Sequence, residues 1–226
     1  MRIILSTPIL LLSFWFIPAK GQQLYMEFGR VLSSFDYEDS EGHSLNNLTG
    51  ASNNWMAVGY RAPIAQKKWF LLGGVSYARY GAKGSDPALD NYYSWDVSYL
   101  GANGGVEYEF FKQQNFFTDQ DGFSFYTRVA IATEFLLQGT QVVNNQVYNL
   151  VGEEQFDKPV FFARGGVGAN YCVSRKLAVF LQYMGGKSFL IFGGSDDKEK
   201  LQYVTHSFSF GLLLSFPQCD YCHSTL

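Results

Sequence analysis

The chain has 226 residues, of which 18% are aromatic and 23 are glycine, and its formal net charge is −3. This length fits one domain. The slight excess of acidic residues excludes a basic face for nucleic acid, so no nucleic-acid partner is expected. A chain rich in aromatic residues and glycine, with few leucine-rich helical periods, favours an all-β protein.

Residues 1–21 are predicted to be a secretory signal peptide. Arg2 supplies a short positive start, and the apolar stretch "IILSTPILLLSFWFIP" follows it. Ala19 and Gly21 are the small residues expected three positions and one position before a cleavage site ahead of Gln22. A membrane anchor is the alternative, but the apolar stretch is short for a span of about 20 residues and contains two prolines.

Eight segments of the remaining chain have the alternation of apolar and polar residues that is typical of β-strands. Long polar connections alternate with mostly short ones, which is the pattern of an up-and-down barrel in an outer membrane. We therefore expect an eight-stranded antiparallel transmembrane β-barrel at 22–216, a periplasmic tail at 217–226, and a location in the bacterial outer membrane. The predicted strands are 24–37, 54–64, 69–80, 92–111, 123–138, 158–173, 177–188 and 203–216.

The charged residues indicate which face of these strands points inward. In 123–138, Arg128 and Glu134 alternate with Phe125, Val129 and Ile131. The interior of an eight-stranded barrel only just accommodates side chains, so the bulky apolar face suits lipid. A soluble lipocalin-like barrel, with its apolar face inward, is the alternative.

A set of seven charged residues shares the inward face. An unpaired charge in a narrow lumen would cost several kcal/mol, so these side chains are expected to pair with one another and to seal the barrel. The alternative is a narrow channel for small solutes. The set is Glu27, Arg61, Glu107, Glu109, Arg128, Glu134 and Arg164.

Two arginines do not fit this pattern. Arg30 lies on the face opposite to Glu27, so the strand either has a bulge near Gly29 or places Arg30 near a membrane interface. Arg79 also lies on the outward face, where its long side chain would extend to lipid headgroups or stand above the membrane.

The three cysteines of the chain leave two interpretations open. "CDYCH" at 219–223 matches the attachment pattern of a c-type haem, but no domain surrounds it. A disulfide among Cys172, Cys219 and Cys222 is expected instead, because 172 is predicted at the periplasmic rim, near the tail. An odd number of cysteines leaves the pairing unassigned. We expect no cofactor and no metal site.

The sequence contains no convincing catalytic set. His206 lies on the lipid-facing side of its strand, and His43 stands beside Ser44 and near Asp39 and Glu41 in a polar loop. Flexible polar loops commonly contain all three of these residue types, so the protein is expected not to be an enzyme. A lipid-modifying enzyme is the alternative.

The segments "GGVSY" and "GGVGANY", the signal ending "AKG" followed by "QQ", and a last strand that ends at Phe216 resemble those of small outer-membrane β-barrel proteins of Bacteroidota-type bacteria. This OmpA-like or PorT-like family has members in secretion and gliding machinery and others that are structural. The chain departs from the family pattern because "PQCDYCHSTL" follows Phe216.

With no convincing catalytic set and no open bore expected, we predict a structural or protein-interaction role, such as an accessory of an outer-membrane secretion or assembly complex. Outer-membrane lipid is one expected partner. A protein partner is expected through the outer loops or the tail, since loops on a rigid barrel are where recognition resides. Apolar loop residues that suit such a contact are Tyr148, Leu150, Val151 and the "FLIF" segment at 189–192. The alternative is that they extend strands or pack one loop against another.

Overall fold

The computed structural model describes most of the predicted barrel and one residue of the tail. The described residues are 22–38, 48–65, 68–86, 91–114, 121–152, 158–189, 200–216 and 222. The predicted signal peptide and the rest of the tail, Cys219 included, lie outside them. In the part of the chain that is described, no helix is long and apolar enough to cross a membrane.

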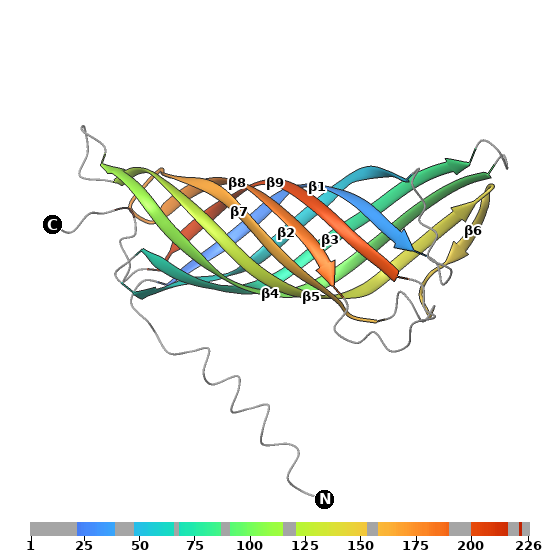
Figure 1. The fold of residues 1–226 in the computed structure, drawn as a ribbon. Coiled ribbons are helices and arrows are strands. Elements are labelled where there is room, and N and C mark those ends of the chain that lie inside the picture. Colours follow the sequence, from blue (N-terminus) through green and yellow to red (C-terminus); the bar gives the residue numbers. More distant parts are fainter. Residues whose placement is uncertain are drawn as a thin grey trace, which may run out of the picture.

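The described chain is a closed antiparallel barrel (Figure 1). Consecutive strands pair from β1 to β5, β5 pairs with β7, and the β1–β9 pairing completes the ring. β6 pairs with the last residues of β5 and lies outside the ring. The strands are β1 Gln23–Glu38, β2 Leu48–Ala65, β3 Trp69–Asp86, β4 Asn91–Gln114, β5 Asp121–Val143, β6 Gln146–Asn149, β7 Val160–Cys172, β8 Leu177–Phe189 and β9 Lys200–Ser215.

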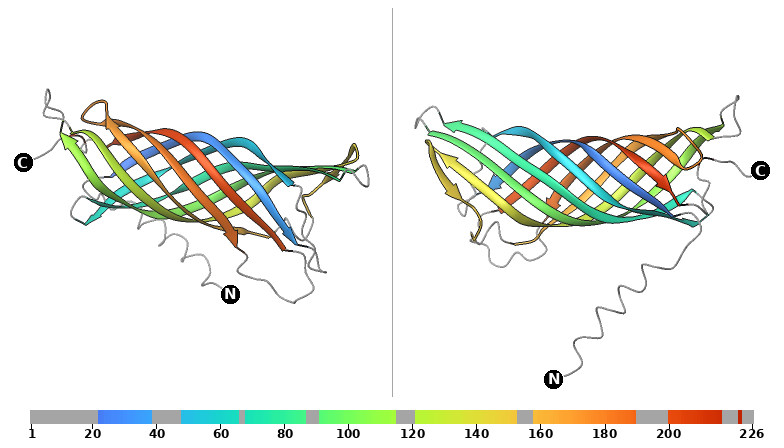
Figure 2. Two further views of the ribbon diagram at one scale, coloured as in Figure 1. Left: turned by 45° about the horizontal axis from the view of Figure 1, so that its top comes forward. Right: turned by 180° about the vertical axis from the view of Figure 1, so that it is seen from behind.

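The predicted eight-stranded up-and-down barrel is confirmed, but several strands are longer than predicted. We call the end of the barrel that holds Gln23 and Ser215 the terminal end, and the opposite end the loop end (Figure 2). At the loop end β2 begins at Leu48, β3 runs to Asp86 and β5 runs to Val143. A ladder above the membrane has water on its outer face, so it continues in segments without apolar alternation.

The ninth strand was not predicted. β6 follows a two-residue turn in which Asn144 and Asn145 have φ values of 47° and 68°. Two central residues with positive φ make the turn type that matches the twist of a hairpin, and asparagine adopts this conformation more readily than most residues. The Asn-Asn pair was therefore the available sequence signal for this hairpin.

The apolar face of the strands points outward. Phe208 and Phe210 of β9 are 65% and 63% exposed, whereas Ser209 between them is 2% exposed. Aromatic pairs lie near the terminal end of this surface, including Tyr60 stacked on Phe216. This polarity contradicts a soluble barrel with an apolar interior. It is the arrangement of a membrane barrel, whose outward apolar band is flanked by aromatic residues.

The two arginines that departed from the pattern both lie on the outward face. β1 pairs with β2 and β9 without a register shift at Gly29 or Arg30, so the proposed bulge is absent from β1. Arg79 forms an ion pair with Asp96 on the neighbouring strand β4, and both side chains are exposed.

Candidate functional site

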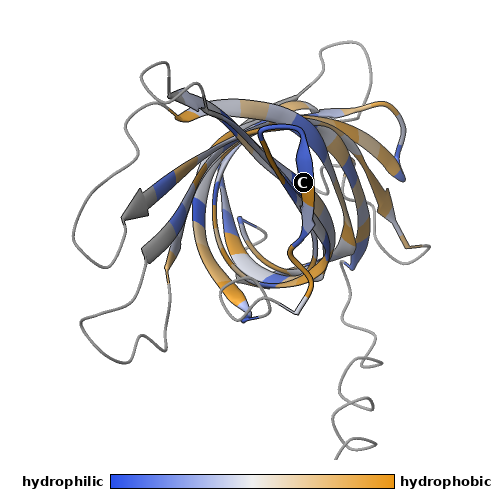
Figure 3. Ribbon diagram, turned by 90° about the vertical axis from the view of Figure 1, so that its right-hand side faces the viewer, coloured by the Kyte–Doolittle hydropathy of each residue, from blue (hydrophilic) through white to orange (hydrophobic). Residues whose placement is uncertain are grey.

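All seven of the predicted lumen residues are buried inside the barrel. Alternate residues of the eight strands that form the ring face this interior, which Figure 3 views along the barrel axis. The seven form two groups of contacts, each containing at least one arginine and one glutamate. We call them the lower cluster, nearer the terminal end, and the upper cluster, nearer the loop end.

Glu107 is the centre of the lower cluster. One of its oxygens, Oε1, accepts hydrogen bonds from Arg61 Nε at 2.9 Å and Nη2 at 2.6 Å. The other, Oε2, accepts from Arg128 Nε at 3.0 Å and Nη2 at 2.7 Å. Arg61 Nη2 also lies 2.7 Å from Glu109 Oε1, and its guanidinium covers the Phe70 ring at 3.4 Å. Each charge of this cluster is therefore compensated by direct contacts.

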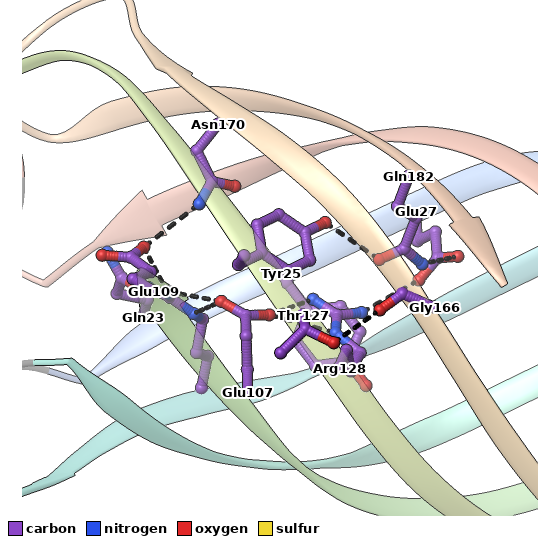
Figure 4. A network of polar contacts seen from close by, with 12 residues as sticks. Gln23, Tyr25, Glu27, Glu107, Glu109, Thr127, Arg128, Gly166, Asn170 and Gln182 are labelled. Atoms are coloured by element: carbon purple, nitrogen blue, oxygen red, sulfur yellow. Dashed lines mark hydrogen bonds and ion pairs between the residues drawn. The ribbon is translucent and has the colours of Figure 1, made fainter. Parts of the chain in front are cut away.

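Glu27 connects the lower cluster to three neutral donors, and Figure 4 shows one of them, Gln182. Its Oε1 accepts hydrogen bonds from Trp55 Nε1 at 2.8 Å, Gln182 Nε2 at 2.6 Å and Ser209 Oγ at 2.6 Å. Its Oε2 lies 3.7 Å from Arg128 Nη1. These contacts join β1, β2, β5, β8 and β9 across the bore, so the network crosses the lumen rather than lining it.

The upper cluster contains Arg164, Glu134 and Tyr80. Arg164 Nη2 donates to Glu134 Oε1 at 2.6 Å and to the Tyr80 hydroxyl at 2.8 Å. The Tyr80 hydroxyl donates to Glu134 Oε2 at 2.7 Å. The guanidinium of Arg164 also lies 4.3 Å from the centre of the Phe162 ring, which covers one of its faces.

A layer of buried aromatic rings fills the bore on the loop side of the upper cluster. Tyr80 lies 5.6 Å from both Phe162 and Tyr203, and Phe35 lies 4.8 Å from Tyr203, measured between ring centres. The Tyr99 and Tyr203 hydroxyls are 3.1 Å apart and hydrogen-bonded. The sequence pattern placed the bulky apolar face toward lipid, but in the loop half of the barrel bulky aromatic side chains also face inward. All five residues alternate in step with the inward-facing residues of their strands, and this alternation was the sequence signal from which the layer could have been predicted.

The space left between the two clusters is small. A cavity of about 40 Å³ touches Glu27, Arg128, Arg164 and Gln182. Since one water needs about 10–15 Å³ by this measure, the cavity has room for two or three waters between polar groups. Above and below it, the bore is crossed by the paired charges and the aromatic layer.

We expect the unmodified barrel to conduct almost no ions, because moving an ion through the bore would break buried charge pairs and displace packed rings. Planar-bilayer recording of the purified, heat-modifiable form measures this directly. An open trimeric porin serves as the positive control, and the boiled preparation serves as the control for contaminants. Steady and reproducible conductance steps from the folded protein would show that the lumen is open.

The structure joins Cys172 at the end of β7 to Cys222 of the tail by a disulfide, with their Cα atoms 5.7 Å apart. Cys222 is fully buried and packs with the barrel core. Cys219 lies outside the described residues. Because the Cys222 sulfur is bonded to Cys172, it is not available for attachment to haem, so the "CDYCH" pattern is not used in that way here.

The candidate contact residues of the third loop differ in exposure. Tyr148 of β6 and Val151 are 49% and 50% exposed. Leu150 is 3% exposed and packs within the core cluster, so its predicted role in partner contact is wrong. The hairpin folds back on β5, and the Leu150 N–H bonds to the Gly139 carbonyl, which draws the side chain inward. Of the "FLIF" segment, Phe189 is described and exposed.

The candidate catalytic residues are not brought together among the described residues. His206 faces outward on β9, where its Nδ1 lies 2.7 Å from the Tyr183 hydroxyl. His43, Ser44, Asp39 and Glu41 lie outside the described part of the chain. Within that part, no three His, Cys, Asp or Glu residues are placed to hold a metal ion.

No protein-family model and no curated protein matches the chain. Similar solved structures include Ail, the attachment invasion locus protein of Yersinia pestis, at 12% identity and a TM-score of 0.40, covering 86% of this chain and 99% of that one. Neisserial surface protein A has 13% identity, a TM-score of 0.46 and coverage of 85% and 97%. The N-terminal barrel of Pseudomonas aeruginosa OprF has 12% identity, a TM-score of 0.37 and coverage of 85% and 98%. At these identities and TM-scores, the likeness carries no information about the activity of this chain.

The strand pairing and the polarity of the surface carry the classification. In a bilayer, an unpaired sheet edge would leave backbone groups without hydrogen bonds, and closure of the ring removes that edge. The outward apolar band and the polar interior complete the description of a transmembrane barrel. The chain is therefore an integral outer-membrane protein built as a closed eight-stranded antiparallel β-barrel.

Proposed function

We propose that this protein is a sealed, non-enzymatic outer-membrane barrel that presents its loop-end hairpins to a protein partner. The observation that carries the proposal is the filled lumen. Two buried charge clusters and an aromatic layer occupy the bore, which favours a role for the outer surface over a role in transport. The likeness of the sequence to Bacteroidota-type barrels supports an accessory role in a secretion or assembly complex of such bacteria.

One side of the barrel extends further at the loop end than the other. β5 pairs with β7 up to Glu134 and then continues to Val143, a distance of about 30 Å along the strand. β3, β4 and β6 accompany it, and Figures 1 and 2 show this group reaching beyond the ends of β8 and β9. An ordered sheet of this length above the membrane offers a rigid surface, as recognition on a scaffold requires.

The β5–β6 hairpin supplies apolar contact groups on this extension. Val147 is 67% exposed and Tyr148 is 49% exposed, and both belong to the last strand of the sheet. An exposed last strand carrying apolar side chains is a surface on which a partner strand pairs. The proposed contact surface is therefore β6 with Val151, without Leu150.

Crosslinking in intact cells tests this proposal. A photoreactive phenylalanine analogue at Val147 is expected to give a specific protein adduct that mass spectrometry identifies. Ile131 is the matched control, since it is equally exposed at 67% but lies within the apolar band of β5. We expect adducts with lipid but not with protein at Ile131. Absence of a protein adduct at Val147, or the same adducts at both positions, would contradict the proposed surface.

A further inference from the structure

A row of basic side chains interrupts the outward apolar face on three neighbouring strands. Arg30 of β1, His206 of β9 and Lys187 of β8 all face outward and are exposed. Arg30 pairs in register with Phe208, and the next outward residue of β9 toward the loop end is His206. His206 pairs with Gly185, and the next outward residue of β8 in the same direction is Lys187. We call these three residues the basic row.

The basic row lies where the apolar band ends on the loop side. On β9 the outward residues from Phe216 to Phe208 are all apolar, and His206 is the first polar one. Ten residues separate Phe216 from His206, or about 33 Å of strand. With the usual tilt of 35–45°, this rises about 25 Å, which is the height of the apolar band of an outer-membrane barrel. At this tilt a level line advances by about one to one and a half residues per strand toward the loop end, so the row, which advances by two, rises by only about 2 Å per strand.

Among the described residues, the direct strand neighbours of the basic row do not neutralise it. Its ladder partners on the outward face are Asn54, Phe208, Leu32, Val204, Gly185 and Ala163, none of which is acidic. Arg79, an outward arginine on β3, is different because it is paired with Asp96. The row therefore presents positive charge toward the membrane interface.

Two facing glycines leave the outward surface beside the basic row without side chains, and we call this gap the hollow. Gly165 of β7 and Gly185 of β8 pair in register and both face outward. A Cβ atom at either position would meet no atom closer than 3.9 Å. Tyr183 and His206 stand beside this hollow, hydrogen-bonded to each other through the Tyr183 hydroxyl and His206 Nδ1. The two glycines thus leave space for a thin apolar group next to the cationic residues.

We propose that the basic row and this hollow bind a phosphorylated glycolipid of the outer leaflet. Arg30 and Lys187 hold its phosphate, since a guanidinium forms paired hydrogen bonds with phosphate oxygens and an ammonium adds a point charge. One acyl chain lies in the hollow over Gly165 and Gly185. The inference rests on the proposed orientation, in which the loop end faces outward.

Native mass spectrometry of the detergent-solubilised, delipidated barrel, titrated with diphosphorylated lipid A, tests this site. The double variant Arg30→Gln/Lys187→Gln is expected to bind at least tenfold more weakly than the unmodified protein. The control Arg175→Gln/Lys176→Gln removes the same charge from the exposed β7–β8 turn at the terminal end, and its affinity should not change. Fully dephosphorylated lipid A should bind the unmodified protein as weakly as diphosphorylated lipid A binds the double variant.

Two further arms separate the lipid from free phosphate and test the hollow. Inorganic phosphate at millimolar concentration should not displace lipid A, and Gly185→Leu should weaken lipid A binding severalfold by filling the hollow. Displacement by free phosphate, no effect of Gly185→Leu, or equal losses in the double variant and its control would each overturn the proposal. Every variant is first checked for heat-modifiable migration in vesicles. Failure of the unmodified barrel to insert would refute its membrane location and this site together, whereas insertion without phosphate selectivity would refute this site alone.

Discussion

Replacement of Gly166 with valine will prevent the chain from folding into the barrel. Gly166 faces the interior on β7, and a Cβ atom there would collide with the backbone oxygen of Tyr183 and lie 2.8 Å from the Cα of Met184. Real Cβ atoms essentially never approach other atoms within 3.0 Å. The obstacle is the backbone of the neighbouring strand β8, so no change of side-chain rotamer relieves it. The β7–β8 ladder would have to separate.

The adjacent Gly165 is a matched control for this prediction. It is also a glycine of β7, but a Cβ atom there would meet nothing closer than 3.9 Å. We expect Gly165→Val to give heat-modifiable barrel in normal yield and Gly166→Val to give none, as measured by gel migration after refolding into detergent and by outer-membrane fractionation. Equal yields of folded protein from the two variants would contradict the close packing of the interior.

Replacement of Glu107 with alanine is expected to lower the free energy of unfolding by about 3–5 kcal/mol, because it leaves buried cations without their partner. Glu107 is 1% exposed and accepts hydrogen bonds from both Arg61 and Arg128. Glu109 still faces Arg61, but the ion pair that Arg128 keeps among the described residues is the longer contact of 3.7 Å with Glu27. The measurement is the urea dependence of the folded fraction in lipid vesicles.

The exposed ion pair of Arg79 and Asp96 provides the control for this loss. Asp96→Ala also removes one carboxylate from an arginine, but in water such a pair contributes only about 0–1 kcal/mol. The Glu107 variant should therefore unfold at a clearly lower urea concentration than the Asp96 variant. Similar midpoints would mean that the lumen is hydrated well enough to screen its charges.

The sequence was sufficient to predict the architecture because, in the membrane-spanning part, the alternation of apolar and polar residues and the positions of the charged residues indicate the same inward face. In β5, the alternation of Arg128 and Glu134 with Val129 and Ile131 determined which face was inward. The same reasoning assembled the seven charged lumen residues from strands that are distant in the chain. It could not determine which glutamate meets which arginine, because the pairing depends on the register of five strands around the bore.

Prediction failed where the membrane no longer imposes alternation. Above the lipid both faces of a strand tolerate polar residues. No alternation in the sequence therefore marked Leu48, Asp86 and Val143 as the ends of their strands. The aromatic layer was missed because bulky rings were all assigned to lipid, although Tyr80 shares the parity of buried residues. Leu150 was assigned to the surface because the sequence does not show that its hairpin folds back on β5.

The bond between Cys172 and Cys222 closes a covalent ring that contains all of β8 and β9 but does not include the seam between β9 and β1. The disulfide therefore keeps the last strand, β9, linked to β7 even when the pairing between β9 and β1 is broken. With a sequence separation of 50 between the two cysteines, the chain-entropy model gives a stabilisation of about 4 kcal/mol against the unfolded chain. Because a disulfide persists only in an oxidising compartment, this stabilisation makes the durability of the barrel depend on the redox conditions at its terminal end.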